Sequence, residues 1–536
     1  MFREFCKEVF LGKEECLNRR VIVLHVVLMT LSFLFIYLYS YTTSFRYPFV
    51  GGDSAVFQCV AKFWLDGYIP YKDIFDHKGP IIYLVDAIGY ALQPRSGIMV
   101  PQIIALYITL VFMWRMLSFR WRGASRIIFS VLSVIFLAWF YSNNMTEEFS
   151  LPFIAASAYC FMTWLITSTL TPLHGLIYGM GFGACVLLRT TNSLPICCFV
   201  FLTAITLIKA RDFNALRQNV LSFCSGFAII VLPFVAYFAA NDALYDALYG
   251  TILFNIHYAT EGSFHHEAST YIILNAINLM PLILTIIASL IELSFDRKNT
   301  LAWICLFVST MLLMMFLKIR SYKHYVTIIV PILPLMFMIL SDALNDSFRR
   351  LKEMWHAPGF SFKRMIICKT LLPLLILPLM LYVGFCFKTY LEALTFPFSE
   401  KLTEEESDFL RVRAEIDEMQ KLIPHAERNS VVTWGHSGSV ARWILETGIK
   451  PRDRFFYNQT ALSPMDPTIR NGCLARIKQD YPLWILYGYE LDKEALFIFV
   501  SLKDEELERL LEDKYVYKGE VSIGVQTLKL YRLHDQ

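Results

Sequence analysis

The sequence is poor in charged residues and in the motifs of soluble enzymes. Of its 536 residues, 18% are charged and 56% are apolar, and the mean hydropathy is +0.47. A soluble domain of this length needs more charged surface, so the composition excludes one and indicates a chain that crosses a membrane repeatedly. No Walker loop, His-Glu-x-x-His helix, Gly-x-Ser-x-Gly turn, long internal repeat or heptad run occurs.

Cysteine is scarce where the sequence looks soluble. The chain has 12 cysteines, most of them inside apolar runs, and Cys473 is the only one after residue 391. A disulfide framework is therefore excluded, and the cysteines are expected to be packing residues.

The net charge of +3 conceals an uneven distribution. From Leu391 onward, 19 Lys and Arg stand against 25 Asp and Glu, whereas the preceding residues carry 30 against 21, mostly beside apolar runs. This split is typical of membrane topology and argues against nucleic-acid binding. The linker 392–401 divides the chain into a predicted transmembrane domain over 1–390 and a predicted external soluble domain over 391–536.

Eleven segments are predicted to cross the membrane, with the N-terminus in the cytoplasm and the C-terminus outside. The first apolar run is too long and too aromatic for a cleavable signal. Residues 81–92 are excluded because they are too few, hold Asp86 and would turn the later basic loops outward. The predicted crossings are 21–41, 98–117, 127–141, 149–168, 175–188, 194–208, 220–240, 271–291, 300–317, 325–341 and 370–390.

The C-terminal region alternates helix and strand patterns, which predicts a small α/β domain. The expected helices are 407–423, 467–478 and 504–512, and the expected strands are 430–434, 482–487 and 525–532. A Gly-Ser turn at 435–439 could bind an anion, although such turns are common after strands.

The first predicted external loop, residues 42–80, is the richest polar stretch among the apolar runs. It contains Gly51-Gly52-Asp53, the turn Gly67-Tyr68-Ile69-Pro70-Tyr71-Lys72-Asp73, and Asp76-His77-Lys78-Gly79-Pro80. The pattern resembles the first external loop of the C-type (GT-C) polyprenyl-phosphate-sugar-dependent glycosyltransferases, which include protein O-mannosyltransferases and the lipid A aminoarabinose transferase. Lys78-Gly79-Pro80 stands where many relatives have Lys-Pro-Pro, and His77 where some have Glu.

The resemblance implies a polytopic α-helical fold of GT-C type and sugar transfer on the external face, with inversion at the sugar carbon. The acceptor hydroxyl needs a base, and Asp53 is predicted to supply it. Basic residues predicted to hold the donor phosphate are Lys78, Arg189, Lys318, Arg320, Lys323 and His324. Residues expected to line the substrate loops are Tyr71, Asp76, His77 and His257.

Several of these residues also have structural explanations. Glu147 and Glu148 are candidate catalytic acids facing Asp53, yet after Thr146 they also suit a helix N-terminus. Asp53 could cap a turn, and the basic cluster 318–324 could anchor the chain at the membrane edge.

A metal is compatible with the sequence but is not required by it. The later loop, 241–270, is expected to hold a surface helix, and its His265-His266 pair lacks a spaced third ligand. The cofactor therefore stays unknown.

Other functional classes fit less well. A transporter or flippase is expected to carry ionisable residues near helix centres and to lack a sizeable external domain. An O-antigen-type polymerase or ligase is expected to place its catalytic loop late in the chain, and a non-enzymatic assembly protein would work through the C-terminal domain. The expected partners are a polyprenyl-phosphate-linked sugar, the lipid bilayer, and a glycolipid, polysaccharide or protein acceptor. The sequence names neither the sugar nor the acceptor.

Overall fold

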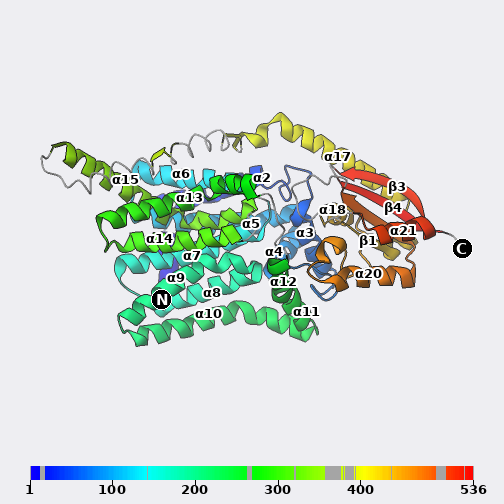
Figure 1. Ribbon diagram of the computed structural model, residues 1–536, viewed down its shortest axis with the longest axis horizontal. Coiled ribbons are helices and arrows are strands. Elements are labelled where there is room, and N and C mark those ends of the chain that lie inside the picture. The colour runs from blue at the N-terminus through cyan, green and yellow to red at the C-terminus, as the bar shows by residue number, and fades with distance from the viewer. Residues whose placement is uncertain are drawn as a thin grey trace.

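The protein has a bundle of long helices at one end and a β-sheet with covering helices at the other (Figure 1). The N-terminus lies at the bundle and the C-terminus beyond the sheet. The computed structural model describes residues 2–534 apart from 12–18, 142, 262–267, 319–321, 357–375, 378–379, 381–390, 393, 436, 491–502 and 524–525.

Within these described residues, nine helical segments are long and apolar enough to cross a membrane. They are built on α2 (Arg19–Tyr39), α5 (Met99–Ser118), α6 (Gly123–Phe140), α7 (Thr146–Thr167), α9 (Leu194–Lys209), α10 (Phe213–Ala240), α13 (Ala268–Phe295), α14 (Thr300–Lys318), and η4 (Lys323–Ile332) continuing into α15 (Leu333–His356). Each of the nine coincides with a predicted crossing. The prediction of a polytopic helical membrane protein is confirmed.

The count of eleven crossings is not established. Helix α8 (Pro172–Leu188) matches a tenth predicted crossing but has only 17 residues. The eleventh, 370–390, falls almost entirely outside the described residues. A short helix, α1 (Phe2–Leu11), precedes the bundle.

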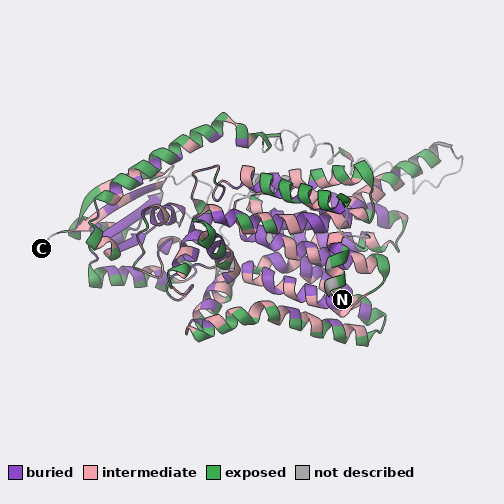
Figure 2. Ribbon diagram, turned by 180° about the vertical axis from the view of Figure 1, so that it is seen from behind, coloured by how far each residue is buried: buried purple, intermediate pink, exposed green. Residues whose placement is uncertain are grey.

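Helices α8 and α10 pack closely because glycines line their contact. Gly175 and Gly179 share one side of α8, and Gly226 lies on the facing side of α10. A Cβ on Gly179 would lie 2.0 Å from the carbonyl oxygen of Phe223, and one on Gly226 would lie 2.2 Å from that of Leu176. Small residues allow membrane helices this close an approach. The outer side of α10 remains exposed (Figure 2).

A layer of short helices lies between the bundle and the sheet (Figure 1). It comprises α3 (Gly52–Leu65), α4 (Pro80–Leu92), α11 (Leu244–Leu248), the π-helical turn η3 (Tyr249–Leu253) and α12 (Phe254–Glu261), and the bundle also holds the 3-10 turns η1 (Ser96–Ile98) and η2 (Thr190–Ser193). With 13 residues, α4 is about 20 Å long. It is too short to cross an apolar layer of roughly 30 Å, as predicted for residues 81–92.

The C-terminal region forms a mixed four-stranded sheet in the order β1-β2-β4-β3. Strand β1 (Val431–Trp434) pairs in parallel with β2 (Trp484–Glu490), which pairs antiparallel with β4 (Gln526–Leu533), and β4 pairs antiparallel with β3 (Tyr515–Ile523). The accompanying helices are η5 (Phe396–Phe398), α17 (Glu400–Lys421), η6 (His425–Ser430), α18 (Ser437–Thr447), α19 (Gln459–Leu462), α20 (Pro467–Asp480) and α21 (Glu505–Lys514). Every helix and strand predicted here is present, whereas α18 and β3 were not predicted.

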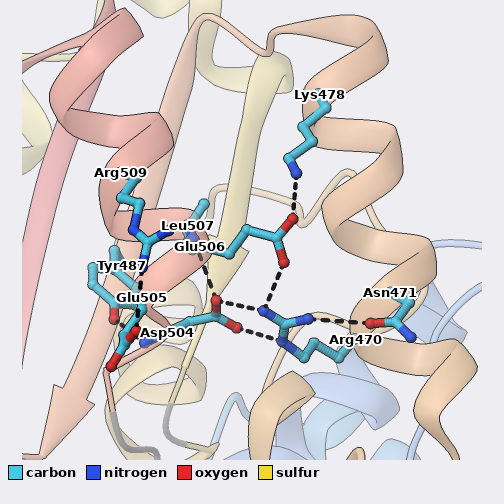
Figure 3. A network of polar contacts seen from close by, with 9 residues as sticks. All are labelled: Arg470, Asn471, Lys478, Tyr487, Asp504, Glu505, Glu506, Leu507 and Arg509. Atoms are coloured by element: carbon cyan, nitrogen blue, oxygen red, sulfur yellow. Dashed lines mark hydrogen bonds and ion pairs between the residues drawn. The ribbon is translucent and has the colours of Figure 1, made fainter.

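Ion pairs join α20 to the start of α21 (Figure 3). Arg470 donates two hydrogen bonds of 2.7 Å to the two carboxylate oxygens of Asp504. Asp504 in turn accepts the backbone N–H of Leu507 at 3.2 Å, which caps α21. Glu506 accepts from both Arg470 and Lys478. These contacts hold the two helices together without any help from the bundle.

The sheet domain packs directly on the first loop. One apolar core contains Val56 and Phe63 of α3 together with Trp443 of α18. The Cys59 thiol donates to the carbonyl oxygen of Ala441 at 3.3 Å. The composition of the chain changes near residue 390, but this one apolar core contains residues from both sides of that boundary.

Candidate active site

Asp53 lies in the first turn of α3, at the start of the layer of short helices. Gly52 has φ +58°, a left-handed conformation that favours glycine, and it directs the chain into the helix. The Asp53 side chain is exposed and has no hydrogen bond or ion pair with any other described residue. Its charge acts on His77, His324 and Tyr325. The structure therefore presents an open carboxylate, next to a helix N-terminus that favours negative charge.

Lys78 ends a chain of polar contacts that begins at Asp76. Oδ2 of Asp76 accepts the Tyr83 hydroxyl at 2.6 Å, and Oδ1 lies 3.3 Å from Nδ1 of His77. Nε2 of His77 lies 2.9 Å from Nζ of Lys78. A neutral imidazole protonated on Nδ1 fits both neighbours, because its N–H faces the Asp76 carboxylate and its Nε2 accepts from the ammonium group of Lys78.

Titration of this chain is set by its burial and its neighbours. Burial lowers the pKa of His77 and the Lys78 charge lowers it further, against the opposing effects of Asp76 and Asp53. Burial raises the pKa of Asp76, but the His77 contact, the Lys78 charge and a hydrogen bond from Tyr457 outweigh it and hold that pKa below its usual range. Asp76 is thus an anion and His77 a neutral ring near pH 7.

Glu147 and Arg189 form an ion pair in which Glu147 is buried and Arg189 is partly buried. Nη1 of Arg189 lies 2.8 Å from Oε1 of Glu147, whose side chain is 2% exposed. The guanidinium group stacks over the Tyr325 ring, 3.5 Å from its centroid. His324 is within reach of the charges of Glu147, Arg189, Asp53 and Lys78. The structure therefore brings together predicted residues from four separate segments of the sequence: the first loop, the start of α7, the residue before η2, and the start of η4.

The remainder of the predicted basic cluster is less central. Lys323 lies over the ring of Trp139, with Nζ 3.3 Å from the centroid, which is a contact suited to an interfacial anchor. Lys318 is the last residue of α14. Arg320 lies outside the described residues, so its predicted role stays a prediction.

Glu148 differs from Glu147 in its partners. Its Oε1 accepts the backbone N–H of Met145 at 3.2 Å, and its Oε2 accepts from Gln102 at 3.0 Å. This is the contact set of a residue that caps the start of α7. Of the two acids, Glu147 is the one paired with a basic residue of the site.

Hydrogen bonds from side chains to backbone carbonyl oxygens hold the loops around the site. Tyr71 is buried with φ +68°, and its hydroxyl donates to the Lys78 carbonyl oxygen at 2.7 Å. Gly250, in the π-helical turn, leaves room for the Tyr71 ring, since a Cβ there would lie 2.6 Å from it. Asn255 donates to the His77 carbonyl oxygen at 2.7 Å. His257 is exposed in α12, where its charge acts on Asp466 of the sheet domain.

Sequence reasoning missed Tyr325 and Tyr457, which contact the site from distant segments. The position of Tyr325 directly after Lys323-His324 was an available signal. Tyr457 lies in the polar C-terminal region, where no sequence pattern indicated a contact with the site.

No group of three His, Cys, Asp or Glu side chains in the described part of the chain is arranged to hold a metal ion. The His265-His266 pair lies outside that part.

Of the comparisons with known proteins, only the one with solved structures bears on the fold. No family model and no curated protein sequence matches the chain. Among solved structures, ArnT from Cupriavidus metallidurans bound to undecaprenyl phosphate matches with a TM-score of 0.53 and 11% sequence identity, covering 95% of this chain and 97% of that one. The fold is that of ArnT. The apo structure of the same ArnT gives a TM-score of 0.52 with the same identity and coverage. The resemblance to GT-C enzymes read from the first loop is confirmed at the level of the fold.

The ArnT-like arrangement brings together two kinds of chemistry. The Asp53 carboxylate, which has no partner among the described residues, can accept a proton. Lys78 and Arg189 are both near enough to His324 for their positive charges to act on it, and such cations can stabilise an anion. A carboxylate near cations suits a displacement in which the leaving group departs as an anion.

Proposed function

We propose that this chain is a membrane glycosyltransferase of GT-C type that moves a sugar from a polyprenyl-phosphate carrier to an acceptor on the external face of the membrane. The observation that carries the proposal is that the Asp53 carboxylate, without a partner in the described part of the chain, acts on His324 together with Lys78 and Arg189, on an ArnT-like fold. ArnT itself was crystallised with undecaprenyl phosphate, which is a lipid of the proposed class.

The proposed reaction is a single displacement. Asp53 takes the proton of the acceptor hydroxyl while that oxygen attacks the anomeric carbon of the sugar. The bond from this carbon to the phosphate oxygen breaks, and its electron pair leaves with the polyprenyl phosphate. Lys78 and Arg189 stabilise the negative charge that develops on the phosphate. Attack opposite the leaving group inverts the sugar carbon.

The surroundings of the two cations support different roles. Arg189 is already paired with Glu147, so it offers the phosphate only its remaining donors. The contact of Lys78 is with a neutral imidazole, which leaves its positive charge uncompensated at that contact. Lys78 is therefore the proposed main phosphate ligand, and Arg189 the secondary one. The acceptor is a glycolipid, a polysaccharide or a protein, and the sugar is a hexose or a pentose.

Membranes that contain the protein, incubated with a panel of radiolabelled polyprenyl-phosphate sugars, test the proposal. Label should move into an extracted glycolipid, polysaccharide or protein fraction only with the matching donor, and release free polyprenyl phosphate in equal amount. Movement of the intact labelled lipid between leaflets, without sugar transfer, would identify a flippase instead.

A further inference from the structure

The side chain of Tyr457, in the sheet domain, contacts Asp76 beside the proposed donor site. Tyr457 lies in the segment between α18 and α19, and its side chain is buried. Its hydroxyl donates a hydrogen bond to Oδ1 of Asp76, the oxygen that also faces Nδ1 of His77. Because Tyr83 donates to the other oxygen, both oxygens of Asp76 are occupied.

We infer that Tyr457 is a positioning residue for Lys78, so that the C-terminal domain completes the donor-phosphate site. This inference rests on the proposed function. The contacts form one series: the Tyr457 hydroxyl donates to the Asp76 carboxylate, that carboxylate faces Nδ1 of His77, and Nε2 of His77 faces the ammonium group of Lys78. Lysine has a long stem with many rotamers, so a fixed acceptor beside its end restricts where the charge lies.

Other contacts hold the same segment in register. The backbone N–H of Phe75 donates to the carbonyl oxygen of Arg454 at 2.9 Å, three residues before Tyr457. The Arg454 side chain pairs with Asp246 of α11 at 2.8 Å, and Tyr249 donates to Asp466. The first loop, the later loop and the sheet domain therefore meet at Asp76, and the Tyr457 contact lies within a built interface.

The test is binding of undecaprenyl phosphate to the purified full-length protein in detergent, with Tyr457→Phe as the decisive variant. This change removes one hydroxyl and keeps the ring in its core. The matched control is Tyr487→Phe, which removes a buried hydroxyl that accepts the Asp504 N–H at 2.7 Å in the same domain (Figure 3). Tyr457→Phe should weaken binding about tenfold, the lower end for losing a hydrogen bond to a charged group, and the control should bind like the parent.

A double-variant cycle separates positioning from general destabilisation. If Tyr457 acts through Lys78, then Tyr457→Phe should cause no further loss of binding in a Lys78→Ala protein. An unchanged affinity in Tyr457→Phe, or a loss that adds in full to that of Lys78→Ala, overturns the inference. Should Tyr457→Phe fail to fold, His77→Ala removes the middle member of the same series of contacts. It should then weaken binding in the parent and cause no further loss in Lys78→Ala. Parent-like binding by Lys78→Ala would overturn the proposed donor site together with the inference, whereas loss in Lys78→Ala beside parent-like Tyr457→Phe overturns the inference alone.

Discussion

Arg189 and Glu147 are paired across 2.8 Å in the interior of the molecule, where their side chains are 19% and 2% exposed. Arg189 precedes η2 and Glu147 stands in the first turn of α7. A buried pair contributes little net stability compared with apolar residues of the same shape, but breaking it leaves an uncompensated charge. The pair and the Asp53 carboxylate act on the same two side chains, His324 and Tyr325, and a role in the proposed chemistry is a prediction that can be tested.

Removing one member of the pair should therefore differ from replacing both. Arg189→Met is expected to cost about 3 to 5 kcal/mol of stability, because Glu147 is left buried and unpaired. Adding Glu147→Gln should restore most of that stability without restoring sugar transfer. Thermal unfolding in detergent, measured beside the transfer rate, checks both parts. Recovery of transfer in the double variant would make the pair purely structural.

Asp53→Asn should abolish most transfer and leave the fold intact. Asn has nearly the same shape but cannot accept the acceptor proton, so the rate should fall by on the order of 10² or more. Stability should be unchanged, since the side chain is exposed and has no hydrogen bond among the described residues. Asp66→Asn is the control: this exposed carboxylate at the other end of α3 lies 3.3 Å from Nζ of Lys450, and its change should leave transfer unaffected. Normal turnover by Asp53→Asn would reduce Asp53 to a structural residue.

His77 should make the protein sensitive to mild acid. Its pKa is lowered in the folded state, chiefly by burial and by Lys78, so below the ordinary value of 6.5 the unfolded chain binds more protons than the folded one. Stability should then fall as the pH drops from 6.5 toward the lowered pKa. Unfolding temperatures between pH 7 and pH 5 measure this loss, which should be smaller in His77→Gln. An equal loss in both proteins would assign the acid sensitivity to other groups.

The contact between α8 and α10 should not tolerate a methyl group. Gly179→Ala places a Cβ 2.0 Å from a backbone oxygen of α10, so the helices must separate, at a cost of about 1 to 3 kcal/mol. Gly472→Ala in α20 is the control, because a Cβ there meets nothing within 4 Å, and it should stabilise by about 0.5 to 1 kcal/mol. Equal effects on the unfolding temperature would contradict close packing of the two helices.

The orientation of the chain can be tested with introduced cysteines, because the native Cys473 is buried. Lys518, in β3, and Arg211, between α9 and α10, are both exposed. Lys518→Cys should react with an impermeant thiol reagent in intact cells, whereas Arg211→Cys should react only after the cells are opened. The reverse result would invert the predicted topology.

Most of the fold could be predicted from the lengths of the apolar runs, because a helix needs about 20 apolar residues to cross a bilayer whatever it packs against. Two of the missed elements, β3 and α18, lack such a pattern. Strand β3 is largely exposed, holds Lys518 and Glu520, and has a bulge beside Gly519, so no alternation marks it. Helix α18 begins with Ser437-Gly438-Ser439, which reads as a turn.

The sequence indicated those residues of the candidate site that are close together in the chain, and their roles stay predictions. Asp53, His77 and Lys78 share one loop, and the loop motif indicated them together. The pairing of Glu147 with Arg189 spans 42 residues, and that of Asp76 with Tyr457 spans 381. No local pattern specifies contacts of that separation, since they depend on how the domains pack.

The contact between Tyr457 and Asp76 also sets an order for biogenesis. Asp76 is synthesised early, while its hydrogen-bond partner emerges 381 residues later. Until then the apolar face of α3, including Val56 and Phe63, has no α18 to cover it. The ribosome must therefore complete almost the whole polypeptide before the site can form. A chain that ends after the bundle would leave this apolar surface exposed to the cell's quality-control proteases.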